Sequence, residues 1–251
     1  MPRIFQPIPL KTGARIALNE GASHHLARVL RAEVGDAVTL FNGEGGEFDA
    51  VITQITKKNV EVEILQFVPR DAESPLDICL AQGIAKGEKM DFIVQKAVEL
   101  GVKKIVPLLT ERCNVRLDET REKKRVMHWQ SVIVSACEQS GRNRVPEIVP
   151  PVAYADWISN EIAGFKFVLS PHTSNRFTDA DISLDASITV LIGPEGGLSE
   201  SEIKLALDYG FTALNLGPRV LRTETATLAA LTFFQTLYGD MKVANNLPDR
   251  Q

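Results

Sequence analysis

The sequence predicts an α/β protein with a small amino-terminal β-rich module and a larger carboxy-terminal part built on a mostly parallel sheet. Residues up to about 68 consist of alternating apolar runs separated by turn signals. Residues 68–75 (VPRDAESP) then place two prolines around a polar run, which is typical of a linker. After this linker, strand-like and helix-like segments alternate, as they do in parallel α/β sheets. We therefore expect one domain at 1–70 and a second at 76–245.

The amino-terminal module is expected to be a compact β-barrel with one short helix. The run 37–41, the glycine-rich turn 42–46 and the run 48–55 indicate a hairpin. Residues 60–65 (VEVEIL) alternate cleanly, so one face of this strand is expected to be buried. A helix fits residues 24–30, with Ser23 as its cap.

The carboxy-terminal part is expected to contain five strands and five helices. Short apolar runs predict the strands, at 76–81, 104–109, 165–169, 188–192 and 213–216. Helical periodicity and capping signals predict the helices, at 89–100, 119–138, 154–162, 200–209 and 224–237. Ser199 and Glu202 form a capping box for the fourth helix, which ends at Gly210, and Thr223 or Thr225 is expected to cap the last.

Composition restricts the class of protein. With 44% apolar and 24% charged residues, the 251-residue chain is typical of a soluble globular protein. Its three cysteines are widely spaced, which indicates neither a disulfide framework nor a zinc site, and no metal is expected. The amino terminus lacks the apolar core of a signal peptide, and no run reaches membrane-spanning length. We expect a cytoplasmic protein that does not bind membranes.

Two loops of similar design stand out. Residues 193–197 (GPEGG) follow the strand 188–192, and residues 217–222 (GPRVLR) follow the strand 213–216. Since the carboxyl ends of parallel strands share one edge of a sheet, the loops are expected to form a pocket lined by main chain for a nucleotide-like ligand. Neither loop has the spacing of a P-loop or a Rossmann dinucleotide site, which argues against an ATPase and a nicotinamide-dependent dehydrogenase.

Charged residues suggest where a polyanion could bind. The net charge of −4 argues weakly against nucleic acid, but the positive charges are clustered. Arg3, Arg28 and Arg31 lie in the amino-terminal module with His24 and His25 beside the latter two. Residues 139–144 (QSGRNR) end a helix with donors that suit a phosphate backbone, although any helix terminus needs such groups.

Several segments together resemble a known enzyme family. They are 24–31 (HHLARVLR), 41–45 (FNGEG), 96–102 (KAVELGV), 138–142 (EQSGR), 191–197 (LIGPEGG) and 216–226 (LGPRVLRTETA). In this order they resemble the knotted (SPOUT) class of S-adenosylmethionine-dependent RNA methyltransferases. Within that class, the chain is similar to the group that makes 3-methyluridine in the 16S ribosomal RNA of the small subunit.

The resemblance implies a fold, a cofactor and partners. The carboxy-terminal domain should contain a deep trefoil knot, and the amino-terminal module should adopt the PUA RNA-binding fold. S-adenosylmethionine is the implied cofactor, and 16S rRNA or the small ribosomal subunit is the implied substrate. The family works as a homodimer with the pocket near the interface.

The resemblance also implies which residues act. The adenosine should lie bent between three loops, and the residues expected to bind it are Leu169, Ile192, Gly193, Pro194, Glu195, Gly196, Gly197, Leu216, Gly217, Val220, Leu221 and Thr225. Arg222 is expected to stabilise the developing uracil anion. Glu195 and Glu224 remain alternative proton acceptors, although a glutamate in a first helical turn is more typical of capping. The residues expected to contact RNA are Arg3, His25, Arg28, Arg31 and Arg142.

Two other functions remain open from the sequence. A related methyltransferase with the same cofactor would modify a ribose 2′-hydroxyl group or a transfer RNA base. Alternatively, the chain would be a non-catalytic RNA-binding factor in ribosome assembly that retains a relic pocket.

Overall fold

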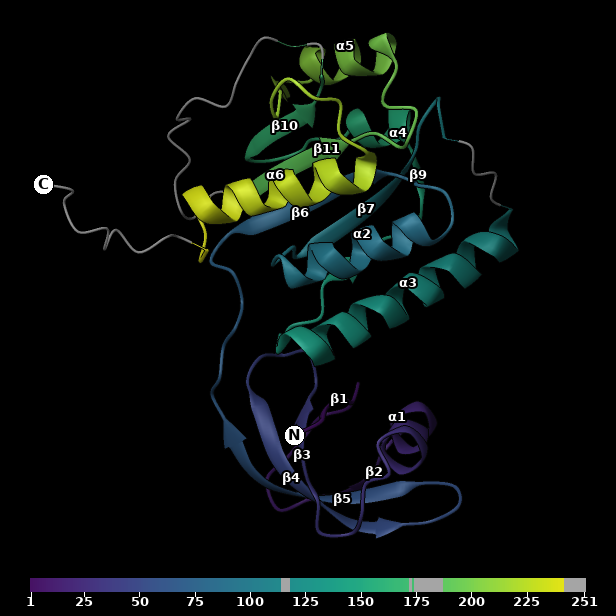
Figure 1. Ribbon diagram of the computed structural model, residues 1–251, viewed down its shortest axis with the longest axis vertical. Coiled ribbons are helices and arrows are strands. Elements are labelled where there is room, and N and C mark those ends of the chain that lie inside the picture. The colour runs from purple at the N-terminus through teal and green to yellow at the C-terminus, as the bar shows by residue number, and fades with distance from the viewer. Residues whose placement is uncertain (114–117, 172, 174–186, 242–251) are drawn as a thin grey trace, which may run out of the picture. The chain divides into compact units, whose positions relative to one another are not determined.

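The computed structural model describes residues 1–113, 118–171, 173 and 187–241. The chain folds into two compact units. The first consists of Met1–Glu73 and Val134–Val145, and the second consists of Ser74–Ile133 and Pro146–Gln251. Figure 1 labels their helices and strands. The predicted end of the second domain, at residue 245, lies outside the described residues.

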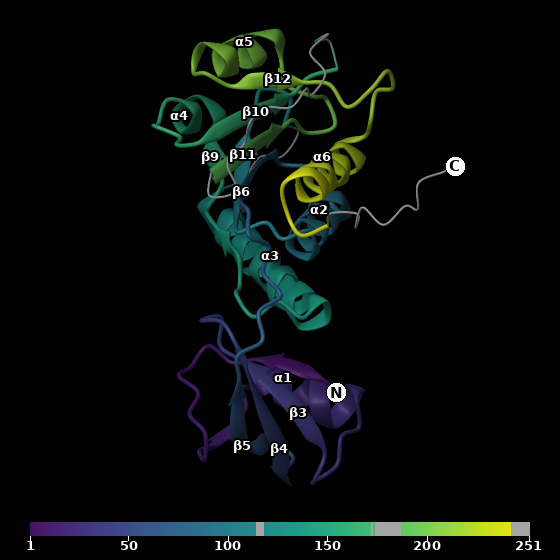
Figure 2. The same cartoon turned by 90° about the vertical axis from the view of Figure 1, so that its left-hand side faces the viewer.

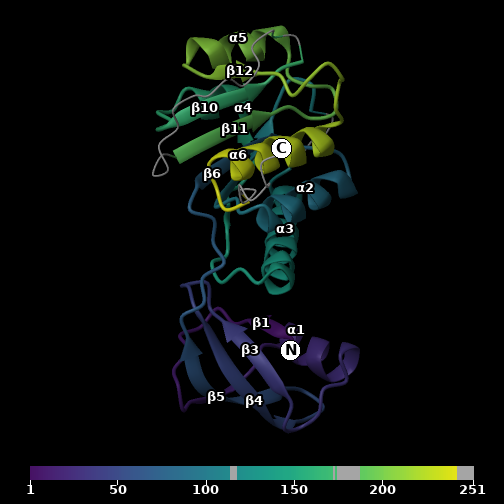
Figure 3. The ribbon, with the colours of Figure 1, turned by 60° about the vertical axis from the view of Figure 1, so that its left-hand side comes forward.

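The first unit is built on a curved five-stranded sheet (Figure 3). In spatial order its strands are β1 (Arg3–Phe5), β3 (Ala37–Phe41), β4 (Glu47–Ile55), β5 (Val60–Val68) and β2 (Arg15–Ala17). The predicted hairpin and the alternating strand are confirmed as β3, β4 and β5. The two edge strands were not predicted because three residues carry little periodicity. No ladder among the described residues joins the edge strands β1 and β2.

The helix of this unit begins four residues before its predicted start and has a different cap. Helix α1 (Glu20–His24) is capped by Asn19, whose Oδ1 accepts a hydrogen bond from the backbone N–H of Ala22 at 2.9 Å. Ser23, the predicted cap, is buried instead, and its hydroxyl satisfies the backbone N–H of Val60 at 3.1 Å. A π-helical turn, His25–Val29, follows directly. The prediction failed because the hydroxyl of Ser23 is taken up by a strand distant in the sequence.

The second unit contains a seven-stranded sheet in which every recorded ladder is parallel. Six strands follow the order β12 (Thr212–Leu214), β10 (Phe165–Leu169), β11 (Ser187–Ile192), β6 (Asp77–Gly83), β7 (Lys104–Leu109) and β8 (Glu147–Ile148). The seventh, β9 (Val152–Ala153), also pairs with β7. The predicted parallel α/β sheet is therefore confirmed, with β8 and β9 too short to be read from the sequence.

Helices cover both faces of this sheet (Figure 2). On one face lie α2 (Glu88–Glu99) and α6 (Thr223–Leu237), and on the other lie α4 (Tyr154–Ile158) and α5 (Glu200–Asp208). The remaining helix, α3 (Glu119–Ser140), begins in the second unit and ends in residues of the first. Parallel strands buried on both faces need continuous apolar runs, which explains the sequence of β11.

The predicted N-terminal cap was confirmed for α5 and was wrong for α6. The capping box of α5 forms between Ser199 and Glu202, as the spacing predicts. At α6 the N-cap is Arg222, which makes no capping hydrogen bond through its side chain. Thr223 is already helical, and its hydroxyl donates to the carbonyl of Gly193 at 2.7 Å. Thr223 does not cap α6 because its hydroxyl donates to a buried carbonyl of the neighbouring loop instead.

The strand order brings three strand ends together at one edge. The chain leaves β11 and passes back across β10 to form β12, whereas β6 leads away to β7, so the connections from the neighbouring strands β11 and β6 run in opposite directions. Crevices at such switch points are where open parallel sheets bind ligands. The loops that follow β10, β11 and β12 are therefore placed to form a site.

Candidate functional site

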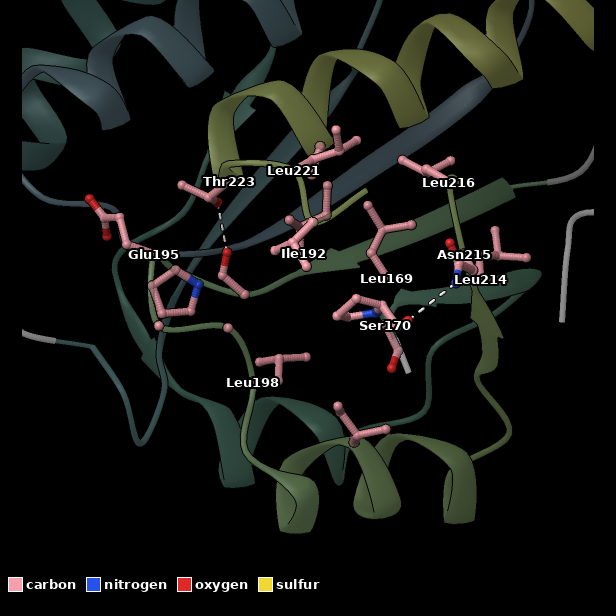
Figure 4. A pocket seen from close by; sticks show the side chains of 18 of the residues that line it. Leu169, Ser170, Ile192, Glu195, Leu198, Leu214, Asn215, Leu216, Leu221 and Thr223 are labelled. Carbon is pink, nitrogen blue, oxygen red and sulfur yellow. Dashed lines mark hydrogen bonds between the residues drawn. The ribbon is translucent and has the colours of Figure 1, made fainter. Parts of the chain in front are cut away.

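A cavity of about 290 Å³ opens at this edge (Figure 4). Its volume is close to the lower end of the usual range for small-molecule sites, roughly 300 to 1,000 Å³. The wall comes mainly from the three loops and from apolar side chains at the ends of β10, β11 and β12. The cavity therefore combines main-chain groups with a leucine- and isoleucine-rich lining.

Most residues expected to bind the cofactor line this cavity. They are Leu169, Ile192, Gly193, Pro194, Glu195, Gly196, Gly197, Leu216, Val220 and Leu221. Gly217 and Thr225 are not among the lining residues. Thr225 instead lines a groove on the outer side of α6 together with Phe92.

The glycine loop needs its first glycine for steric reasons. The backbone N–H of Gly197 donates to the carbonyl of Pro194 at 2.8 Å, which closes a tight turn, and Gly197 has a positive φ of 68°. A Cβ on Gly193 would lie 2.6 Å from the backbone nitrogen of Leu198 and 2.7 Å from the carbonyl carbon of Gly197. Neither neighbour is a flexible side chain, so only glycine fits at position 193 without moving the loop.

Glu195 is bound on the side of the loop that faces α2. Its Oε1 accepts a hydrogen bond from the backbone N–H of Lys86 at 3.0 Å and lies 3.4 Å from the ammonium nitrogen of Lys89. Burial raises the pKa of Glu195, but the backbone N–H groups of Glu195 and Lys86 and the Lys89 ammonium group lower it further, so the pKa lies below its ordinary value. The carboxylate is ionised and anchored.

Arg112 and Asn215 hold the loops in place, and neither was predicted. The guanidinium group of Arg112 donates to the carbonyls of Gly196 at 3.0 Å and Leu198 at 3.4 Å. The side-chain amide of Asn215 donates to the carbonyls of Pro171 at 3.2 Å and Thr173 at 3.0 Å, which ties the β12 loop to the β10 loop. Each follows the carboxyl end of a strand, and this position is the signal that was available in the sequence.

The two arginines of the β12 loop are placed differently. Both are exposed, but Arg219 lines the cavity and Arg222 does not. Between them, Val220 is 83% exposed. Glu224 follows in the first turn of α6, where its Oε2 is buried without a hydrogen-bond partner among the described residues.

The residues expected to contact RNA fall into two groups in the first unit. His25, Arg28 and Arg31 are exposed, and Arg31 is the one described non-glycine residue with a positive φ, at 53°. Arg3 is largely buried and forms an ion pair with Glu47. The side chain of Arg142 is 4% exposed, and its guanidinium group is bound by the carboxylate of Glu73. An RNA contact by Arg142 would first require that ion pair to open.

The described part of the chain holds neither a candidate metal centre nor a candidate membrane span. No cluster of three or more His, Cys, Asp or Glu residues there has metal-binding geometry. No described helix combines the length and apolar character needed to cross a bilayer.

Comparison with known proteins identifies the family. Residues 72–235 match the RNA methyltransferase domain family, and residues 18–65 match the RNA methyltransferase PUA domain family. A curated protein of Buchnera aphidicola named ribosomal RNA small subunit methyltransferase E is 38% identical over 96% of this chain and 98% of its own length. The chain belongs to this methyltransferase family. A Bacillus subtilis member is 30% identical over 83% of this chain and 85% of its own length.

Solved structures agree with this assignment. A Legionella pneumophila protein described as a methyltransferase, with bound S-adenosylmethionine, is 43% identical with a TM-score of 0.92, over 95% of this chain and 98% of that one. Ribosomal RNA small subunit methyltransferase E from Neisseria gonorrhoeae, also bound to S-adenosylmethionine, is 41% identical with a TM-score of 0.89, over 96% and 99% of the two chains. S-adenosylmethionine is the family's methyl donor.

The cavity fits such a cofactor on its own geometry. Close main-chain packing at Gly193 leaves no room for a side chain, so backbone groups form that part of the wall. Ile192, Leu216 and Leu221 supply apolar surface from two of the loops. A purine ring suits an apolar slot whose edges are main-chain donors and acceptors.

Proposed function

We propose that this chain methylates N3 of a uridine in 16S ribosomal RNA of the small subunit, using S-adenosylmethionine. The observation that carries the proposal is the cavity formed by the glycine loop and the 215–222 loop at the switch point of the sheet. The family relationship supports the same reaction.

The three loops are proposed to hold the adenosyl group. The turn at Pro194–Gly197 and the end of β11 form one wall, and Leu216 and residues 219–221 form another. Bound S-adenosylmethionine supplies an activated methyl group. Arg112 and Asn215 keep the loops at fixed separations, so less ordering is needed on binding.

Arg222 is proposed to stabilise negative charge on the uracil as N3 loses its proton. It is exposed at the start of α6 and makes no capping hydrogen bond, so its guanidinium group is available to a base presented at the mouth of the cavity. Glu195 is less suited to accept the proton because its pKa is lowered and its Oε1 is bound to Lys86. We propose that it anchors the loop instead.

The first unit is proposed to hold the RNA backbone while the target uridine is turned out of its stack. His25, Arg28 and Arg31 are exposed there and are free to meet phosphates. Arg3 and Arg142 are bound to Glu47 and Glu73. Because both guanidinium groups are already paired with carboxylates, we propose that Arg3 and Arg142 stabilise the first unit and do not contact phosphates directly.

The enzyme is proposed to act as a homodimer. An apolar groove runs along α6 and α2, lined by Phe92, Glu224, Thr225, Leu228, Ala229, Thr232, Phe233, Thr236 and Leu237. Phe92 and Leu237 are 41% and 40% exposed, which is costly for aromatic and aliphatic side chains clustered at one site. A second copy of the same groove would cover these residues.

A deep trefoil knot in the second unit is also part of the proposal. The strand order β12-β10-β11-β6 supports it, because the chain crosses β10 and then returns to pack α6 against α2. An experimental electron-density map with a continuous trace through this unit will test the knot.

The decisive experiment for the reaction is methyl incorporation into small-subunit RNA followed by nucleoside analysis. Recovery of 3-methyluridine supports the proposal. A 2′-O-methylated nucleoside or a modified transfer RNA would replace it with a related methyl transfer. Calorimetry with S-adenosylmethionine runs in parallel, and a folded protein that binds none would indicate a non-catalytic RNA-binding factor.

A further inference from the structure

One completely buried side chain touches both walls of the cavity from behind. Gln82 is the last residue but one of β6 and is 0% exposed. It pairs in register with Ile192, the last residue of β11. Its side chain is not part of the cavity wall, so it would not contact a bound ligand.

The amide of Gln82 is surrounded by polar groups from three segments. Its Nε2 lies 2.9 Å from the carbonyl oxygen of Gly83, 3.2 Å from that of Gly193 and 3.0 Å from Oγ1 of Thr223. Its Oε1 accepts a hydrogen bond from the hydroxyl of Thr227 at 2.8 Å. Two carbonyl oxygens can only accept, so they determine which end of the amide faces the loop.

The bonded partners belong to the two loops of the site. Gly193 begins the glycine loop, and Thr223 ends the loop that carries Arg219 and Arg222. Both Gly193 and Thr223 line the cavity, and they are bonded to each other. Gln82 therefore connects β6 to both loops at the point where they meet.

We propose that Gln82 is a positioning residue that fixes the separation and orientation of the two cofactor loops. The inference rests on the proposed methyl-transfer function and deepens it. Removing the amide leaves the fold intact, but the direct bond between Thr223 and Gly193 then remains without the bonds that tie both loops to β6. The cavity then fits its ligand less well, and the reacting groups align less often.

The chain offers a matched control on helix α6. Gln235 is also buried, at 1% exposure, and its amide also joins separate segments. It accepts from Ser74 Oγ at 2.8 Å and donates to the carbonyl of Leu100 at 2.8 Å. Twelve positions separate it from Thr223, which is about 18 Å along an α-helix. Gln235→Met thus makes the same chemical change far from the cavity.

The experiment compares full-length wild type, Gln82→Met and Gln235→Met. Methionine nearly matches the shape of glutamine and is apolar, so both variants are expected to fold with a similar loss of stability. The measurements are the affinity for S-adenosylmethionine by calorimetry, kcat and KM for RNA methylation, and amide hydrogen exchange of residues 193–198 and 219–223 without ligand.

Gln82→Met is expected to weaken S-adenosylmethionine binding by about tenfold, to lower kcat, and to speed exchange in both loops. Gln235→Met should match wild type in all three measurements despite its loss of stability. Equal cofactor affinity and equal loop exchange in Gln82→Met and wild type would overturn the inference while leaving the enzyme assignment in place. Wild type that fails to bind S-adenosylmethionine would instead refute the proposed function.

A double-mutant cycle separates positioning from general destabilisation. Thr227→Val removes the hydroxyl that bonds to Oε1 of Gln82 and to the carbonyl of Thr223, and Thr227 itself does not line the cavity. If the network acts as a unit, the loss of cofactor affinity in the double variant is smaller than the sum of the two single losses. Fully additive losses would contradict the inference.

Discussion

The carboxylate of Glu195 accepts a hydrogen bond from the backbone N–H of Lys86, at 3.0 Å, across 109 residues of sequence. This bond joins the glycine loop to the segment that leads into α2. Lys89 lies close enough to pair with the same oxygen, at 3.4 Å. Glu195 therefore has a structural role as an anchor of the glycine loop. This role and the alternative role of proton acceptor predict different effects of substitution.

Glu195→Gln distinguishes an anchor from a proton acceptor. As an anchor, the residue can be replaced by glutamine with a small change in cofactor affinity, a few-fold at most, because an amide oxygen still accepts from Lys86. As a general base, its loss should lower kcat by about 10² to 10⁴. We expect Glu195 to be an anchor, so kcat at saturating substrates should change little in Glu195→Gln. Glu200→Gln, an exposed glutamate on α5, is the control.

The same residue predicts a pH dependence. Because the pKa of Glu195 is lowered in the folded protein, its anchoring contribution is complete above the ordinary carboxyl pKa and is lost as the pH falls through the lower, folded value. The difference in cofactor affinity between wild type and Glu195→Gln should therefore be constant near neutral pH and shrink only in the acidic range. Titration calorimetry at several pH values measures it. A difference that already shrinks around neutral pH would contradict the assigned pKa.

Arg222→Ala should separate binding from turnover. The side chain is outside the cavity wall, so the affinity for S-adenosylmethionine should be unchanged. The loss of a preorganised cation near the uracil should lower kcat by about 10² to 10³. Arg219→Ala is the comparison, because Arg219 lines the cavity and should affect cofactor affinity more. Unchanged turnover in Arg222→Ala would remove that residue from the mechanism.

Two glycines of one loop should tolerate alanine differently. Gly193→Ala places a Cβ against the backbone of Leu198 and Gly197, so the loop must move and cofactor binding should fall by about tenfold or more. Gly196→Ala places its Cβ 3.1 Å from the Cβ of Arg112, a tight contact that a small shift of this exposed part of the loop relieves. That variant should bind nearly as wild type. Calorimetry on both variants tests the steric argument, and equal affinities would refute it.

The parts of this fold that sequence predicts well are local. The capping box of Ser199 and Glu202 lies within four consecutive residues, and β11 is one continuous apolar run, so both follow from neighbouring residues alone. The glycine loop was recognised for the same reason. Family resemblance then added the cofactor and the reaction, which no local pattern contains.

The contacts that fix the site are not local. Asn215 reaches Pro171 across 44 residues, Arg112 reaches Gly196 across 84 and Gln82 reaches Gly193 across 111. Each is a polar side chain without a motif of its own, and only the packing of parallel strands brings it to its partner. The predictions that Ser23 and Thr223 cap helices were wrong for a related reason. Their hydroxyl groups form hydrogen bonds with residues that are distant in the sequence.

RNA binding should depend on the exposed arginines of the first unit. Arg28→Ala and Arg31→Ala should each weaken binding and lower the slope of log affinity against log salt by about one. Arg15→Ala is the matched control, because this arginine is exposed in the same unit and pairs with Glu63. Filter binding at several salt concentrations measures the slopes. Equal slopes for all three variants would place the RNA elsewhere.

Dimer formation should depend on the apolar groove along α6. Leu237→Glu introduces a charge at a position that is 40% exposed in the single chain, so folding should change little while association is lost. Met127→Glu is the control, since Met127 is 73% exposed on α3 and lies outside the groove. Sedimentation velocity should show wild type and Met127→Glu as dimers and Leu237→Glu as a monomer. A dimeric Leu237→Glu variant would show that the groove is not the interface, because a buried glutamate facing its own copy could not be accommodated.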